Sequence, residues 1–233
     1  MPGERLLRIL ALLSPPGVTG PGTARLCDVC AEVSAMSGAG IMLMSDDVPI
    51  GSVCTTNEVS AQIEDLQFTL GEGPCVDAYK LGRPVLEPDL ADPGTARWLG
   101  FSPLALAAGA RALFGFPLQV GAVRLGALNL YRDRPGPLSD DQHADALVMA
   151  DVAAHDVLAI QGHSAAGSVA AGIDVGADFH LVVHQASGMV AAQLGVTVGE
   201  AMMRLRAYVF AHETTLTTVA IAIVGRQLRF DSQ

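Results

Sequence analysis

The chain has 233 residues, of which 50% are hydrophobic and 16% are charged, and its formal net charge at pH 7 is −10. This acidic balance excludes a protein that coats nucleic acid or an anionic membrane with its whole surface. The apolar content is enough for one large core, or for one core and a small second unit.

The N-terminal segment 1–14 is apolar but is interrupted by Arg8, and it is followed by Pro15-Pro16 instead of a small-residue cleavage site. It predicts an amphipathic helix and not a signal peptide. No later stretch approaches the roughly 20 uninterrupted apolar residues of a membrane span. We therefore expect a cytoplasmic protein without a membrane partner, in which the four cysteines are reduced thiols.

Two of these cysteines, Cys27 and Cys30, form a C-x-x-C pair on a predicted helix. Such a pair can supply two thiolates to a redox or metal site, but no histidine or second C-x-x-C stands at zinc spacing. We expect two buried side chains on one helical face. A redox role for Cys54 or Cys75 stays open as a separate hypothesis.

Residues 39–56 predict a β-hairpin, in which Pro49 near a strand start indicates an edge strand or a bulge. Asn57 is then expected to cap a helix that runs to about residue 66. The sequence Gly-Glu-Gly-Pro-Cys at 71–75 opens the next helix, with its proline at the first helical position.

The same junction could turn backbone N–H groups toward an anion. The lysine and Ser/Thr of a phosphate loop are missing, so a structural turn is favoured over a phosphate site. If a small molecule binds here, we expect Gly73 and Cys75 to contribute to its site.

A short strand is predicted at 83–86, a loop and short helix at 98–109, and two long strands at 111–120 and 123–132. The tight joint between the long strands requires an antiparallel hairpin. A long helix then opens at a capping box beginning at Ser139 and runs to about residue 161. Its expected apolar stripe, which is suited to pack on the sheet or form a dimer seam, is Leu147, Ala150, Ala154 and Leu158.

This order of elements resembles a GAF domain. The resemblance rests on four pieces of sequence, namely 71–75, Gly82-Arg83-Pro84-Val85, 114–118 and 126–131. It implies a six-stranded antiparallel sheet with helices on one side and a small-molecule pocket on the other. GAF domains bind cyclic nucleotides, bilins, haem or other small molecules, and many bind nothing. No haem-ligating histidine or bilin attachment site is assignable here, so we expect no cofactor.

Three short amphipathic helices follow, over about 178–194, 198–210 and 215–227. Gly195 is expected to end the first helix in the left-handed conformation, and Thr197 with Glu200 fits a capping box for the second. Three such helices in a row predict a small bundle. The first two are expected to bury Phe179, Val183, Ala186, Val190, Val198, Ala201, Met202, Leu205 and Val209.

These helices resemble the ANTAR domain, a three-helix RNA-binding module of bacterial transcription antiterminators. The resemblance rests on Ala186-Ser187-Gly188-Met189, on 195–201, on Leu205-Arg206 and on 216–220. It implies an α+β chain with a GAF-like sensor domain at 1–161, a linker at 162–177 and an all-α RNA-binding domain at 178–233. The implied function is a signal-responsive regulator that binds hairpin RNA in nascent transcripts and acts by antitermination.

The resemblance places the RNA contacts on the exposed side of this bundle, where planar and polar side chains reach loop bases. The residues expected to make them are His184, Gln185, Ser187, Arg204 and Arg206. The family often has basic residues where this chain has Ser187 and Thr214-Thr215. Four arginines are balanced by four acids from 178 onward, so binding requires charges gathered on one face or doubled in a homodimer.

Two other functions are weighed against this one. Met203, Ala207 and Phe210 form an apolar outer face, which favours a protein-interaction or dimerisation adaptor without RNA binding. His180 and His184 stand at i and i+4 but lack a third ligand, so no metal is expected. No nucleophile elbow, paired-carboxylate signature or dinucleotide fingerprint is present, so an enzyme is not expected. The sequence names neither the signal nor the transcript.

Overall fold

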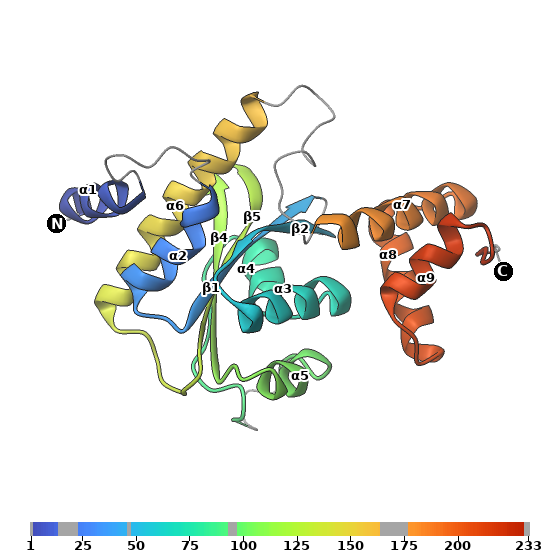
Figure 1. Cartoon of the computed structure of the whole chain (residues 1–233), viewed down its shortest axis with the longest axis horizontal. Helices are drawn as coiled ribbons and strands as arrows, with labels where there is room; N and C mark the ends of the chain where they lie inside the picture. Colours follow the sequence, from blue (N-terminus) through green and yellow to red (C-terminus); the bar gives the residue numbers. More distant parts are fainter. Residues whose placement is uncertain (1, 14–22, 46–47, 93–96, 164–176, 231–233) are drawn as a thin grey trace.

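The computed structural model describes residues 2–13, 23–45, 48–92, 97–163 and 177–230 (Figure 1). Its helices are α1 (Pro2–Leu13), α2 (Thr23–Ser34), α3 (Glu58–Leu70), α4 (Pro74–Leu81), α5 (Phe101–Ala107), α6 (Asp140–His163), α7 (Ala177–Leu194), α8 (Val198–Ala211) and α9 (Leu216–Val224). Its strands are β1 (Gly38–Ser45), β2 (Val48–Thr55), β3 (Val85–Glu87), β4 (Ala112–Val120) and β5 (Val123–Arg132).

The strands form one antiparallel sheet in the order β2-β1-β5-β4-β3. Both predicted hairpins are confirmed, as β1–β2 and β4–β5. The strand β2 lies at an edge of the sheet, and its pairing register shifts next to Pro49, as the proline predicted.

The expectation of six strands with helices on one side only is wrong for the described residues. The sheet has five strands there, with α2 and α6 on one face and α3 and α4 on the other (Figure 1). The physical reason lies in the strands themselves, because β1 is buried at every residue before Ser45. A central strand without a polar, solvated face must be covered on both sides.

The long helix α6 opens as predicted, since the Ser139 and Gln142 side chains each bond the backbone N–H of the other residue. Of the predicted stripe, Ala150 and Ala154 are buried and Leu158 is half-buried, whereas Leu147 is exposed. Asp145, outside that stripe, is buried as well, because α1 covers its side of α6. Arg5 and Arg8 of α1 each donate to Asp145 Oδ1, at 2.6 and 2.7 Å.

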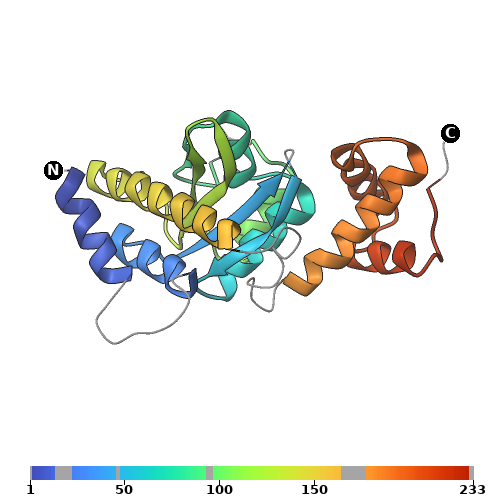
Figure 2. The ribbon, with the colours of Figure 1, turned by 90° about the horizontal axis from the view of Figure 1, so that it is seen from above.

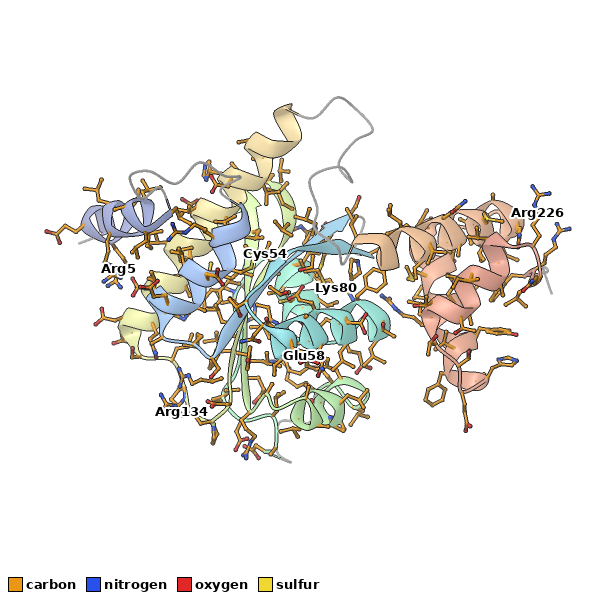
Figure 3. The ribbon with its side chains drawn as sticks, viewed as in Figure 1. Arg5, Cys54, Glu58, Lys80, Arg134 and Arg226 are labelled. Atoms are coloured by element: carbon orange, nitrogen blue, oxygen red, sulfur yellow. A yellow bond between two sulfur atoms is a disulfide. The ribbon has the colours of Figure 1, made fainter. Side chains whose placement is uncertain are left out.

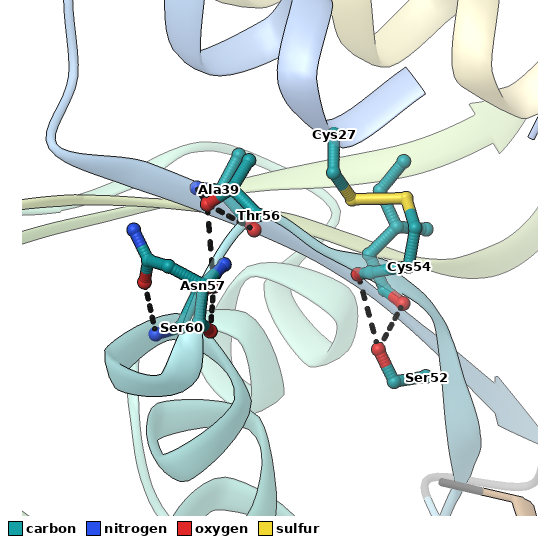
Figure 4. The surroundings of a disulfide bond; sticks show 8 residues. Cys27, Ala39, Ser52, Cys54, Thr56, Asn57 and Ser60 are labelled. Carbon is teal, nitrogen blue, oxygen red and sulfur yellow. Dashed lines mark hydrogen bonds between the residues drawn. A yellow bond between two sulfur atoms is a disulfide. The ribbon is translucent and has the colours of Figure 1, made fainter. Parts of the chain in front are cut away.

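The prediction of four reduced cysteines is wrong for one pair. Cys27 of α2 and Cys54 of β2 form a disulfide (Figure 4). The crossing of α2 over β2 brings their Cα atoms to 5.9 Å, within the range that a disulfide bridges. Cys30 is a buried free thiol, so the prediction that Cys27 and Cys30 are both buried on one helical face is confirmed.

The helices α7, α8 and α9, which we call the tail, form the predicted three-helix bundle at the end of the molecule next to β2 (Figure 2). Gly195 has a φ of +65°, and Thr197 and Glu200 form the capping box, both as predicted. Val198 is exposed and not buried, because it precedes the turn of α8 that packs on α7. The Phe179 and His180 side chains lie outside the described ones.

Most of the predicted linker falls at 164–176, outside the described residues, so the division at 161 and 178 stays a prediction. No single helix in the described ranges is long and apolar enough to cross a bilayer. By length and composition alone, one pair does pass that test together, Leu181–Leu194 with Val198–Ala211, but it is bent by 106°.

Candidate functional site

A cluster of polar side chains lies in the interior between the sheet and the helices α3 and α4. It consists of Glu64 and Gln67 of α3, Asn129 of β5 and Cys75 of α4, all buried. The two α3 residues share a buried helical face with Ile63 and Phe68, at positions i, i+1, i+4 and i+5 from Ile63. The fold therefore places three polar side chains and a thiol inside an apolar layer.

Glycines on the neighbouring strands let the helices approach Asn129. Asn129 pairs with Gly40 of β1 on one side and with Gly115 of β4 on the other. A Cβ at Gly40 would come within 2.7 Å of Glu64 Oε1, and one at Gly115 would collide with the carbonyl oxygen of Pro74. Only residues without a side chain fit at these two positions.

Several polar atoms of this cluster have no hydrogen-bond partner among the described residues. They are both carboxyl oxygens of Glu64, Nε2 of Gln67, and Nδ2 and Oδ1 of Asn129. Gln67 Oε1, by contrast, accepts a 2.8 Å hydrogen bond from the backbone N–H of Cys75. A buried polar group without a partner costs about 1–3 kcal/mol. These atoms make the cluster the candidate site within the described interior.

Burial raises the pKa of Glu64 to about 8. The neighbouring Asn129 amide acts in the opposite direction and lowers the pKa, although no hydrogen bond of normal geometry joins the two side chains. At pH 7 the carboxyl group is therefore largely neutral and can donate as well as accept a hydrogen bond.

The thiol of Cys75 lies at the same place. Burial, and then the neighbouring Glu64, raise the pKa of Cys75 well above its usual range. A thiol that stays protonated is a poor nucleophile, so this environment argues against a redox role for Cys75.

Of the two residues predicted to contribute to a ligand site, Cys75 is a member of this cluster and Gly73 borders it. Gly73 has a φ of +127°, and a Cβ there would lie 2.7 Å from Cγ of Gln67. Sequence reasoning missed Glu64, Gln67 and Asn129 themselves. Two signals were present. Asn129 interrupts the apolar run at 125–130, and the two α3 residues stand at helical spacing with apolar neighbours.

The five tail residues expected to contact RNA fall into two groups. Gln185 and Arg204 are exposed. Ser187 is fully buried, and its hydroxyl donates to the carbonyl oxygen of His184 at 2.9 Å. His184 and Arg206 lie against the N-terminal part of the chain, so the expectation that both arginines reach solvent is wrong for Arg206.

Arg206 bonds the last turn of α3. Its Nη2 donates to the carbonyl oxygen of Phe68 at 2.6 Å, and its Nε donates to that of Thr69 at 3.0 Å. Burial lowers the pKa of Arg206 to about 10, which still leaves the guanidinium charged at neutral pH. Arg226, labelled in Figure 3, lies at the outer end of the tail, away from this contact.

His184 makes a second contact between the tail and the part of the chain that holds the sheet. Its Nε2 donates to the carbonyl oxygen of Ile50 in β2 at 2.6 Å, and its ring meets that of Phe68 edge to face at 5.7 Å. Within the described parts of the chain, no three His, Cys, Asp or Glu side chains gather closely enough to hold a metal ion.

A family model described as GAF domain matches residues 23–155, more than half of the chain. The chain belongs to the GAF domain family. The matched region, which we call the GAF domain, ends before the tail begins. A search of curated proteins gave no match.

Two solved structures resemble the chain in fold. The GAF domain from an Acinetobacter phosphoenolpyruvate-protein phosphotransferase is 9% identical with a TM-score of 0.53, and the match covers 70% of this chain and 96% of that one. The GAF domain of a phosphoenolpyruvate-protein phosphotransferase from Coxiella burnetii is 12% identical with a TM-score of 0.50, covering 69% and 95%. At these identities the likeness concerns the fold alone.

Proposed function

We propose that the chain is a signal-responsive regulator, in which the GAF domain receives a small polar molecule and the tail delivers the response. The observation that carries the proposal is the double role of α3. Its inner face holds Glu64 and Gln67 in the interior, and its last turn accepts the hydrogen bonds of Arg206. A molecule bound at the polar cluster therefore acts on the helix that holds the tail.

The response we propose is binding of hairpin RNA in nascent transcripts, leading to antitermination in the cytoplasm. Its support is the tail sequence, which resembles the ANTAR domain, together with the three-helix bundle that this sequence forms. Gln185 and Arg204 are exposed and available for such a contact. Neither role requires the protein to be an enzyme.

RNA binding is tested by filter binding of the full chain to an RNA that carries two hairpins with short loops. Arg204→Ala should weaken binding and reduce the slope of log affinity against log salt by about one. Arg134→Ala, which removes an exposed arginine from the GAF domain, is the matched control and should change neither. Equal affinity of wild type and Arg204→Ala would remove Arg204 from the contact.

A second function is favoured by one specific observation. Phe210 is 88% exposed and Met203 is 60% exposed on the same helix, which is a large apolar area for a free surface. On this account the tail is a dimerisation or protein-interaction adaptor. Sedimentation of wild type and Phe210→Ser separates the two accounts: a dimer that Phe210→Ser dissociates, in a protein that does not bind the RNA, supports the adaptor.

A further inference from the structure

The contact between tail and GAF domain is made at the C-terminal end of a helix. The helix α3 ends at Gly71, whose φ is +66° and whose N–H bonds the carbonyl oxygen of Gln67. The next carbonyls along the chain, of Phe68 and Thr69, lie in its last turn, where carbonyl oxygens find partners outside the helix. Arg206 donates to both, and its positive charge faces the negative end of the helix dipole.

Gly71 also lies directly against the contact, so that a side chain here would displace the guanidinium of Arg206. A Cβ at this position would collide with Nη1 of Arg206. The neighbouring helix α4 ends at Gly82 with nearly the same backbone, a φ of +61°, but there the nearest atom to an added Cβ is Gln119 Oε1 at 3.6 Å. The two glycines thus share a conformation and differ in whether the tail lies against them.

The docked tail cannot present its whole expected RNA-contacting side. Arg206 and His184 are bonded to α3 and β2, and Ser187 is buried, which leaves Gln185 and Arg204 exposed. We propose that this contact is an inhibitory lock within the chain: docking of Arg206 and His184 on the GAF domain withholds the RNA-contacting side of the tail, and undocking releases it. The proposal rests on the proposed function.

The lock combines polar and apolar contacts. Its polar part consists of the hydrogen bonds of two side chains beside the edge of the Phe68 ring, and its apolar part joins buried tail residues such as Val183 to the cluster that holds Met44, Val48 and Phe68. Arg206 is taken from water for these bonds, which offsets part of their value. Docked and free states that differ little in free energy can be shifted by modest differential binding of a ligand.

The path from the GAF interior to the lock is short. Gln67 immediately precedes Phe68, and its side chain holds the start of α4 through the N–H of Cys75. A ligand that draws Gln67 or Glu64 toward itself moves the last turn of α3, and with it the carbonyls that Arg206 bonds. Ligand binding and tail docking are then linked through one helix turn.

Modification of histidines by diethyl pyrocarbonate, followed by mass spectrometry of peptides, reports docking directly in the full chain. Nε2 of His184 is engaged with Ile50 in the docked tail, whereas His155 on α6 is exposed and serves as the internal reference. Arg206→Ala and Gly71→Ala should each raise the rate at His184 roughly tenfold relative to His155. Arg204→Ala and Gly82→Ala, the matched controls, should leave the ratio unchanged.

The Gly71→Ala variant has a second use, because it disturbs docking while keeping all the expected RNA contacts. It should bind the two-hairpin RNA more tightly than wild type, and Gly82→Ala should bind as wild type does. An unchanged rate at His184 in both Arg206→Ala and Gly71→Ala would overturn the lock. A faster rate at His184 without RNA binding by any variant would overturn RNA as the output, and would leave the docking contact standing.

Discussion

The carboxyl group of Glu64 lies beside the side-chain amide of Asn129, deep between α3 and the central strand β5. Neither side chain has a hydrogen-bond partner in the described residues. Protonation of the Glu64 carboxyl group is therefore coupled to the packing of α3, the helix that the tail contacts through Arg206.

Glu64 should make the stability of the GAF domain depend on pH. Its pKa is about 8 in the folded chain and near 4.5 in the unfolded chain. Below pH 4.5 both states hold the proton; as pH rises, the unfolded state loses it first, so stability falls by about 1.4 kcal/mol per unit until about pH 8.

Glu64→Gln keeps the shape and removes the titration. In urea unfolding at a series of pH values, the variant should be more stable than wild type at pH 8, by up to about 4 kcal/mol, and the difference should shrink toward pH 4.5. Glu58→Gln, on the exposed start of α3, is the control. The same pH dependence in wild type and Glu64→Gln would contradict the buried carboxyl.

The disulfide should stabilise the GAF domain mainly by constraining the unfolded chain. The bond closes a loop with a sequence separation of 27, for which chain entropy gives about 3.5 kcal/mol. Cys27→Ser combined with Cys54→Ser should lose that amount in urea unfolding. Dithiothreitol should lower the stability of wild type and leave the double variant unchanged; equal sensitivity of the two proteins to the reductant would argue against the bond.

Asn57 joins the start of α3 to β5 and to the residue that precedes β1. Its Oδ1 accepts from the backbone N–H of Ser60 at 2.9 Å and from the hydroxyl of Tyr131 at 3.1 Å, and its Nδ2 donates to Ser37. Asn57→Ala should cost about 2 kcal/mol in chemical unfolding. Glu58→Ala is the neighbouring control, and a loss no larger than the control's would show that the cap contributes little.

Two glycines of the tail should respond to alanine in opposite ways. Gly188 lies within α7, and no heavy atom stands within 4 Å of an added Cβ, so Gly188→Ala should stabilise the helix by about 0.5–1 kcal/mol. Gly195 has a positive φ, so Gly195→Ala should destabilise the tail by about 1 kcal/mol. Amide hydrogen exchange of the tail measures both, and shifts of the same sign would contradict the described backbone.

The sequence predicted those features that depend on neighbouring residues. The caps at Asn57 and Thr197, the left-handed Gly195 and both hairpins follow from local chemistry and were confirmed. The missed features join segments far apart in the chain. Cys27 meets Cys54, Glu64 meets Asn129, and Arg206 meets Phe68 across 138 positions. No periodicity or spacing in one sequence encodes such encounters, which arise only when helices pack on the sheet.

Arg206 shows the consequence most clearly. Its place beside the apolar stripe of α8 made it a candidate for an exposed RNA contact, and the helix does present it at that edge. The partner on the other side is the end of α3, which supplies two carbonyl oxygens in place of solvent. The helical periodicity of α8 predicts the direction in which the Arg206 side chain points. The packing of the tail on α3 determines which groups it contacts.

The central claim is that the tail rests on the GAF domain through Arg206 in the absence of a signal. Small-angle X-ray scattering of the full chain, compared between wild type and Arg206→Ala, tests it most directly. The account predicts that the wild-type profile fits the docked arrangement and that Arg206→Ala increases the maximum dimension and the radius of gyration, while Arg204→Ala does not. A wild-type profile of two detached bodies, unchanged by Arg206→Ala, would contradict it.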